Sequence, residues 1–277
     1  MPQLVTTVKG LRDALAQRRG AGPAALVPTM GALHEGHLSL LREARNHAGT
    51  VVTSIFVNPT QFAPHEDFDA YPRNPDADLE KLKGHTDIVF TPSVAEMYPR
   101  GHATSISVGG PSAGLETDFR PHFFTGVATV VAKLLIAALP DVALFGEKDY
   151  QQLLVVRRLV RDLGLPVEII GVPTLREADG LALSSRNAYL DPKERKIAGT
   201  LNVVLKDAIV QSRSSGDLRT AEASAIEALW EAGFGHVDYV AIRDAETLDH
   251  IAALERPARI LAAAKIGKTR LIDNMPL

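Results

Sequence analysis

Two histidines three positions apart, His34 and His37, follow an apolar run and a glycine-containing loop. The apolar residues 24–27 predict a buried strand, and the residues from Leu38 onward have the spacing of an amphipathic helix. A helix that begins behind such a loop offers free N–H groups and the positive end of its dipole to an anion. The imidazoles can add ring N–H donors, and Gly36 between them should let a ligand approach the backbone closely. We therefore expect this segment to bind an anion.

Ordinary surface histidines at a helix start, or a zinc site, are the other interpretations of this pair. Zinc metalloproteases place their histidines four positions apart in HExxH on one helix face. This chain has HEGH instead, with a glycine inside the motif. Zinc binding by the pair is therefore disfavoured.

A second group of charged and polar residues follows other predicted strands. Lys148 and Asp149 lie in GEKD on a strand-to-helix turn. A lysine supplies a mobile positive charge for phosphate, and a neighbouring carboxylate suits Mg²⁺, which takes oxygen ligands and usually bridges phosphates. Ser184, Ser185 and Arg186 offer two hydroxyls and a guanidinium to a polyphosphate. The alternatives are a solvated charged turn at GEKD and a plain turn at the serines.

Together these residues can stabilise negative charge on a triphosphate while a nucleophile attacks phosphorus. Neither GxxxxGK[ST] nor GxGxxG follows a predicted strand, so the sequence argues against a P-loop enzyme and a dinucleotide-binding fold. Ser184 and Ser185 lack the G-x-S-x-G context of a hydrolase nucleophile.

The elements that must position these residues alternate between strand and helix through the first two-thirds of the chain. We expect strands at 24–27, 51–57, 88–90, 142–145 and 167–172, and helices at 5–18, 38–48, 76–83, 127–139 and 150–163. Residues 98–126, rich in Gly, Pro and His, are expected to be irregular. The alternation predicts an α/β fold with a doubly wound, Rossmann-like parallel sheet.

Polar loops follow three of these strands directly, at 34–37, 58–61 and 146–152. The carboxyl ends of parallel strands form the edge where such folds bind ligands, so the three loops should meet there. After Thr174 the pattern changes to helices at 192–211 and 220–232 and strands at 237–243, 259–266 and 269–272. We expect a first domain over residues 1–174 and a second, smaller α+β domain over residues 175–277 that covers the site.

The composition is that of a soluble globular protein: 277 residues, 45% hydrophobic, 23% charged, with a formal net charge of −3. This balance gives no electrostatic reason to expect nucleic-acid or membrane partners. The chain has no cysteine, which excludes disulfides, thiol nucleophiles and cysteine–zinc sites. It shows neither a leader before Leu4 nor an apolar run that could span a bilayer, so we expect a cytoplasmic protein.

Four motifs, PTMGALHEGH, SIFVNPTQF, FGEKDYQQL and DGLALSSRN, occur in this order. Together they resemble the motifs of the pantothenate synthetases, the pantoate–β-alanine ligases of the HIGH-type nucleotidylyltransferase superfamily. The resemblance covers essentially the whole chain. It implies an ATP-dependent reaction in two steps: pantoate attacks the α-phosphorus of ATP to give pantoyl adenylate and pyrophosphate, and β-alanine then displaces AMP to form pantothenate. It also implies a homodimer.

The resemblance assigns roles to individual residues. It implies catalytic roles for His37, His34, Lys148 and Arg186. It implies ATP contacts from Met30, Gly31, Ala32, Leu33, His34, Glu35, Gly36 and His37, from Gly146, Glu147, Lys148 and Asp149, from Leu175 through its backbone, and from Leu183, Ser184, Ser185 and Arg186 in a mobile loop. It implies substrate contacts from Gln61, Gln152, Asn58 and Arg120. Asp149 is the expected Mg²⁺ ligand, with Asp76 and Asp78 as alternatives.

One motif departs from the family pattern R-P-x-H-F, because this chain reads Arg120-Pro121-His122-Phe123-Phe124 and its histidine comes one position earlier. Three of the four predicted substrate residues, Gln61, Gln152 and Asn58, are neutral amides, which suit a small hydroxy acid. A nucleotidylyltransferase with a phosphate acceptor, which would need additional Arg or Lys there, is the alternative enzyme. A nucleotide-binding regulatory protein without catalysis is the alternative from another class.

Overall fold

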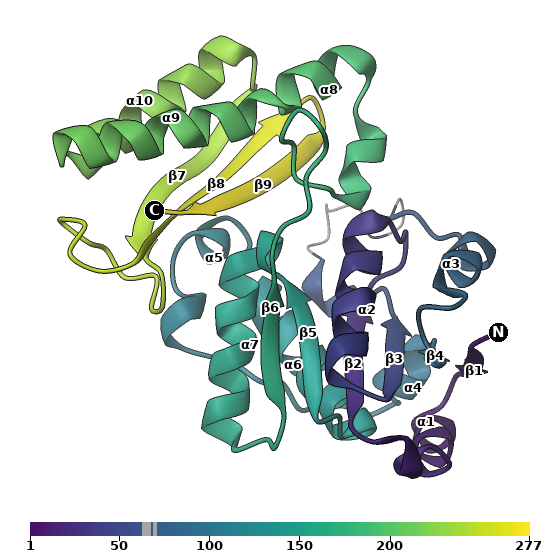
Figure 1. The fold of residues 1–277 in the computed structure, drawn as a ribbon. Helices are drawn as coiled ribbons and strands as arrows, with labels where there is room; N and C mark the ends of the chain where they lie inside the picture. The colour runs from purple at the N-terminus through teal and green to yellow at the C-terminus, as the bar shows by residue number, and fades with distance from the viewer. Residues whose placement is uncertain (63–67, 69–70) are drawn as a thin grey trace.

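The computed structural model describes residues 1–62, 68 and 71–277 (Figure 1). Among these residues, six strands form a parallel sheet in the order β1-β4-β3-β2-β5-β6, and three form a second sheet in the order β7-β8-β9. The second sheet and its helices lie above one end of the parallel sheet (Figure 1). The predicted fold class, a doubly wound parallel sheet with a smaller α+β part, is confirmed.

All neighbouring strands of the large sheet run parallel. Its strands are β1 (Gln3–Val5), β2 (Ala24–Thr29), β3 (Thr50–Ile55), β4 (Ile88–Phe90), β5 (Val142–Gly146) and β6 (Glu168–Val172). The chain passes from β2 to β3 on one side, whereas β5 pairs with β2 on the other. The crevice outside the carboxyl ends of β2 and β5 is therefore the place where such a sheet binds a ligand.

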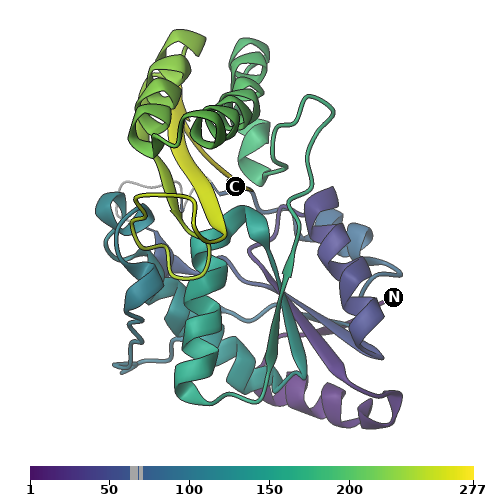
Figure 2. The ribbon, with the colours of Figure 1, turned by 60° about the vertical axis from the view of Figure 1, so that its left-hand side comes forward.

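Helices cover both faces of the parallel sheet (Figure 2). Helices α1 (Val8–Ala16), α6 (Phe123–Ala138) and α7 (Tyr150–Leu163) share one apolar core, and α2 (Glu35–His47) and α3 (Pro75–Leu82) share the other. Alternate residues of a strand point to opposite faces, so Leu26 and Val52 enter the first core while Ala25 and Val51 enter the second. Burial on both faces explains the nearly continuous apolar sequence of the strands.

Several predicted boundaries were wrong. The sequence did not indicate β1, a short strand at the edge of the sheet, and the helix expected from residue 5 begins at Val8 because the Thr7 side chain caps it. Residues 98–126, expected to be irregular, include the short helix α5 (Glu116–Phe119) and the start of α6, which begins at Phe123 rather than 127. The single helix expected at 192–211 is two helices separated at Gly199.

The short helix α4 (Val94–Met97) packs on the first core through Met97, and the helices and strands that follow β6 form a separate core. They are α8 (Pro192–Ala198), α9 (Thr200–Ser215), α10 (Leu218–Ala232), β7 (His236–Asp244), β8 (Ala258–Ile266) and β9 (Thr269–Pro276). The last parallel strand ends at Val172, which supports our proposal of a domain boundary near Thr174. Within the described part of the chain, every helix is too short or too polar to cross a bilayer.

Candidate active site

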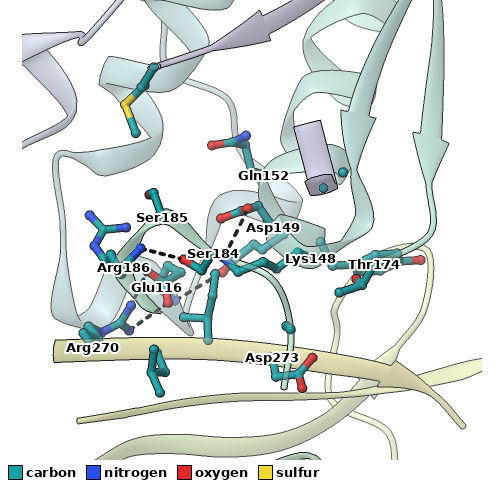
Figure 3. Close-up of a pocket in the computed structure, with 18 of the residues that line it drawn as sticks. Glu116, Lys148, Asp149, Gln152, Thr174, Ser184, Ser185, Arg186, Arg270 and Asp273 are labelled. Carbon is teal, nitrogen blue, oxygen red and sulfur yellow. Dashed lines mark hydrogen bonds and ion pairs between the residues drawn. The ribbon is translucent and has the colours of Figure 1, made fainter. Parts of the chain in front are cut away.

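A cavity of about 850 Å³ lies between the carboxyl edge of the parallel sheet and the second sheet (Figure 3). Most of the predicted site residues line it: Met30, His34, Gly36, His37, Asn58, Gln61, Arg120, Gly146, Lys148, Asp149, Gln152, Leu175, Leu183, Ser184, Ser185 and Arg186. Gly31, Ala32, Leu33, Glu35 and Glu147 are not among its lining residues. The three polar loops at 34–37, 58–61 and 146–152 therefore meet at the sheet edge, as predicted.

The two histidines are held at the start of α2 by local hydrogen bonds. Nδ1 of His34 accepts from the N–H of Gly36 at 3.1 Å, and Nδ1 of His37 accepts from the N–H of His34 at 3.3 Å. The ring centroids are 4.1 Å apart. A neutral imidazole that accepts at Nδ1 carries its proton on Nε2. Both rings therefore have an Nε2–H donor for a ligand.

Both histidines are uncharged at neutral pH. Burial, together with the positive charges of Lys148 and Lys81, lowers the pKa of His34 from 6.5 to about 4. Burial also lowers the pKa of His37 to about 3, helped by His34, Lys148 and Lys81. The pair thus acts as neutral hydrogen-bond donors, and the positive charge at this end of the cavity comes from Lys148.

The absence of a side chain at Gly36 makes room for the His34 ring. A Cβ at this position would lie 2.8 Å from Cε1 of His34. The ring could not then turn back to cap the helix. Close approach of a ligand to Gly36 stays a prediction, and the structure adds that this glycine is needed to accommodate the His34 ring.

The loop before the histidines is anchored by Asp78 in α3, which is 3% exposed. Its carboxylate oxygens accept from the N–H groups of Ala32 at 2.9 Å and Leu33 at 2.8 Å. The preceding Gly31 has φ = 85°, a backbone conformation that favours glycine. Asp78 thus shapes the loop, while Asp76, the other alternative metal ligand, is exposed and does not line the cavity.

Asn58 positions Gln61. Asn58 is 1% exposed, and its Nδ2 donates to Oε1 of Gln61 at 3.1 Å and to the backbone oxygen of Gly126 at 3.2 Å. Its Oδ1 accepts from the hydroxyl of Tyr98 at 2.8 Å. The Gln61 amide nitrogen lies 2.9 Å from Sδ of Met30. A direct contact between Asn58 and a substrate stays a prediction.

Glycine in α6 allows the Gln61 loop to come close. A Cβ at Gly126 would lie 2.4 Å from the backbone oxygen of Thr60 and 2.8 Å from the nitrogen of Gln61. Arg120 adds a further contact, because its Nη2 donates to the backbone oxygen of Gln61 at 3.2 Å. The guanidinium of Arg120 stacks 4.0 Å above the ring of Phe123.

The histidine that departs from the family pattern, His122, is exposed and lies outside the cavity lining. Phe123 and Phe124 line the cavity instead.

Two adjacent glutamines at the start of α7 have different surroundings. Gln151 is buried and donates to the backbone oxygen of Pro111 at 3.0 Å. Gln152 lies in the cavity (Figure 3).

The segment 183–186 leaves a hairpin held by the second sheet. Arg176 in this hairpin contacts both carboxylate oxygens of Asp273, at 2.7 and 2.8 Å. Ser184 caps the following 3₁₀ turn, with its hydroxyl accepting from the N–H of Arg186 at 3.3 Å. The hydroxyl of Ser185 lies 3.4 Å from that of Tyr71. The two hydroxyls and the guanidinium face the cavity as a group (Figure 3).

Asp149 is the predicted metal ligand that lines the cavity, and its side chain is 43% exposed. Its Oδ2 lies 3.7 Å from Nζ of Lys148. Within the described ranges, no group of three or more His, Cys, Asp or Glu side chains could hold a metal ion. Asp149 supplies one half-exposed carboxylate beside Lys148, which fits a Mg²⁺ that takes most of its ligands from phosphates and water, and Mg²⁺ binding there stays a prediction.

Sequence reasoning missed the contribution of the second sheet and of Glu116. Arg270 contacts both carboxylate oxygens of Glu116, at 2.7 and 2.9 Å, and Tyr239 donates to the same carboxylate at 2.9 Å. Burial raises the pKa of Tyr239 well above its ordinary value, and the Glu116 charge adds to this. Arg270 follows Glu116 by 154 positions, so no local pattern could have revealed the pair.

Glu147 and Glu35, predicted ATP contacts, direct their side chains to other residues. Oε2 of Glu147 lies 3.0 Å from Nη2 of Arg259, and Oε1 of Glu35 lies 2.6 Å from Nη2 of Arg42. ATP contacts from these residues remain predictions.

Comparison with known proteins gives one consistent relationship. The family model of the pantoate-beta-alanine ligases matches residues 3–276. Pantothenate synthetases from Mesorhizobium japonicum and Caulobacter vibrioides are 58% and 56% identical to this chain, each over 99% of it and over 97% and 98% of their own lengths.

Solved structures give the same relationship. The crystal structure of the pantothenate synthetase from Thermus thermophilus superposes with a TM-score of 0.92 at 48% identity, over 99% of this chain and 98% of that one. A pantoate-beta-alanine ligase from Francisella tularensis, complexed with beta-gamma ATP and beta-alanine, gives 0.84 at 33% identity, over 99% and 97%.

Proposed function

The chain belongs to the pantoate–β-alanine ligase family, ATP-dependent enzymes that condense pantoate with β-alanine, and we propose that its cavity does so through pantoyl adenylate. In the first step a carboxylate oxygen of pantoate bonds to the α-phosphorus of ATP, and the bond to pyrophosphate breaks. In the second step the β-alanine amine attacks the acyl carbon. The amine loses a proton, and the bond to AMP breaks. Family membership removes the phosphate-acceptor and regulatory alternatives.

One observation supports this proposal most strongly: neutral ring donors and a lysine share one cavity with the amides of Gln61 and Gln152. His34 and His37 each carry Nε2–H, and Lys148 supplies a positive charge beside them. Such preorganised donors stabilise charge that grows on phosphate oxygens during attack. The ribose and adenine would lie toward the Leu175 segment.

The amides of Gln61 and Gln152 are suited to the acceptor. An amide N–H can donate to the pantoate carboxylate or hydroxyl oxygen, and its oxygen can accept from the hydroxyl. Asn58 already donates to Oε1 of Gln61, which leaves the Gln61 N–H groups directed toward Met30 and the cavity. We assign Asn58 and Arg120 to holding the Gln61 loop as well as to the substrate end of the cavity.

We propose that Mg²⁺ binds with ATP at Asp149. The carboxylate lies beside Lys148, and its half-exposed oxygens would supply ligands to the ion. Bound Mg²⁺ would neutralise phosphate charge. Lys148, His34 and His37 bind and orient the same phosphates from the protein side. A homodimer and a cytoplasmic location are further proposals, carried by family membership.

Pyrophosphate exchange tests the two-step reaction. Labelled pyrophosphate should enter ATP when pantoate is present and β-alanine is absent, because the adenylation step is reversible and precedes amide formation. Exchange that does not need pantoate, or that requires β-alanine, would contradict the pantoyl-adenylate proposal.

A further inference from the structure

Strand β9 of the second sheet reaches the turn that carries Lys148. Asn274 in this strand is 3% exposed. Its Nδ2 donates to the backbone oxygen of Glu147 at 2.9 Å and to that of Lys148 at 2.8 Å. Both carbonyls belong to the 3₁₀ turn η4 (Glu147–Asp149), immediately before α7 begins at Tyr150. One amide therefore holds two successive peptide units at the base of the Lys148 side chain.

Arg259 in β8 fixes the orientation of that amide. Its Nε donates to Oδ1 of Asn274 at 2.6 Å, and its Nη2 lies 3.0 Å from Oε2 of Glu147. Its guanidinium stacks 3.7 Å above the ring of Tyr150. The oxygen of Asn274 thus faces a donor and its nitrogen faces two acceptors. A flipped amide would lose all three bonds, so one orientation is strongly preferred.

The neighbouring residue in β9 serves the other phosphate loop. Asp273 pairs with Arg176, in the hairpin that leads to Ser184 and Arg186. Oδ1 of Asp273 also accepts from the backbone N–H of Asn274 at 2.7 Å. Two adjacent residues of one strand therefore hold the base of both loops that we assign to the ATP phosphates.

We infer that Asn274, oriented by Arg259, is a positioning residue that sets Lys148 for adenylation. The inference rests on the proposed function, which gives Lys148 its role. Lys148 supplies the positive charge beside His34 and His37, so its ammonium must lie at a defined distance from the phosphates. Displacement of a reacting group by about 1 Å can cost on the order of 10²-fold in rate. The second sheet thereby contributes to the chemistry through the position of Lys148.

The test uses Asn274→Asp, which keeps the size but replaces the N–H donors with an oxygen that faces two carbonyl oxygens. The new carboxylate can still pair with Arg259, which favours a folded protein. We expect pantoate-dependent pyrophosphate exchange to fall roughly 10- to 100-fold in kcat, with the KM for ATP changed much less. A loss of stability alone lowers the amount of active enzyme. The exchange rate is therefore divided by the concentration of active sites, which is measured by single-turnover adenylate formation.

Glu222→Gln is the matched control. Glu222 is 8% exposed and accepts from the N–H of Ile242 at 2.7 Å, away from the cavity. We expect this variant to lower the melting temperature and to leave kcat for exchange unchanged. Arg259→Met provides a second variant if Asn274→Asp does not fold, because it leaves Asn274 in place but removes the donor that orients it.

A double-mutant cycle with Lys148→Ala separates positioning from a general structural effect. If Asn274 acts through Lys148, Asn274→Asp should change the exchange rate of Lys148→Ala by less than about twofold. Equal effects of Asn274→Asp in both backgrounds would overturn the inference, as would normal kcat in Asn274→Asp or, failing its folding, in Arg259→Met. Normal exchange in Lys148→Ala would remove the role of Lys148 and the inference with it. Exchange by the unmodified enzyme that ignores pantoate would instead refute the proposed function.

Discussion

The two walls of the cavity are held in different ways. On the histidine wall, the bonds that orient His34 and His37 join residues two or three positions apart, and the loop before them is tied to α3 of the same layer. The second wall is formed by the neighbouring Lys148 turn and by Glu116, which are held by Asn274 and Arg270, partners 126 and 154 positions away in the second sheet. The hydrogen bonds of the first wall do not involve the second sheet. The geometry of the second wall depends on the position of that sheet.

This difference suggests that the two walls contribute different kinds of groups to the site. The histidine wall presents neutral donors that are ready before any ligand arrives, since capping fixes their tautomers. The second wall, with Lys148 and Glu116, carries the charged groups. The Lys148 turn has its hydrogen bonds only when Asn274 of β9 contacts η4. Interactions that strengthen in the transition state are the ones that raise kcat. Perturbing each wall separately shows whether both contribute to that step.

Removal of Lys148 or His37, the donors of the two walls, should have the largest effect on the rate of adenylation. We expect Lys148→Ala and His37→Ala each to lower the rate of adenylation by about 10²–10³-fold, with a smaller change in ATP affinity. Pyrophosphate exchange and separate measurement of ATP binding check this. His34→Ala should act in the same direction. If only Lys148→Ala lowered the adenylation rate, His34 and His37 would bind the substrate without stabilising the transition state.

The acceptor end gives the next largest effect. Gln152→Glu keeps the size of the side chain but turns a donor into a negative charge that faces a negative acid. Loss of a hydrogen bond to a charged group costs roughly 1.5–3 kcal/mol, or about 10–150-fold, before repulsion is added. We expect this loss in the pantoate dependence of exchange, with the ATP dependence nearly unchanged. An unaltered pantoate titration would take Gln152 out of the site.

The packing of Gln61 on α6 offers a third, smaller effect. Gly126→Ala places a Cβ against the backbone of Thr60 and Gln61, and overpacking of this kind costs about 1–3 kcal/mol of stability. We expect a lower melting temperature together with a raised KM for pantoate, because the Gln61 loop must move. Ala128→Gly, two positions along the same buried helix, is the control, since it should destabilise without affecting that KM. Equal pantoate responses in both variants would contradict the role given to Gly126.

The local wall and the sheet could be predicted from the sequence because their causes are local. Strand periodicity, the glycine-containing loop and the HEGH spacing lie within short windows, and β4 and α7 have the predicted limits. Strand β1 was missed because three edge residues carry too little pattern. The contacts of Asn274, Arg259 and Glu116 could not be predicted, because each residue is ordinary in its own window and gains its role only from a partner that folding brings near.

The smallest expected effect is the pH dependence of the histidine wall, and it has two parts. The first concerns activity. Because burial lowers the pKa values of His34 and His37 to about 4 and about 3, both rings stay neutral from pH 5.5 to 8, and exchange should show no titration near 6.5.

The second part concerns the pH dependence of stability. The unfolded imidazoles take up protons below their ordinary pKa of 6.5 and the folded ones do not, so these groups destabilise the fold as pH falls from about 6.5 toward 4. The slope cannot exceed about 1.4 kcal/mol per pH unit for each ring. Denaturant unfolding at several pH values should show a weaker slope in His37→Gln than in the unmodified protein. A rate that drops through pH 6.5, or the same slope in His37→Gln as in the unmodified protein, would show that the rings on the local wall are not held neutral by burial.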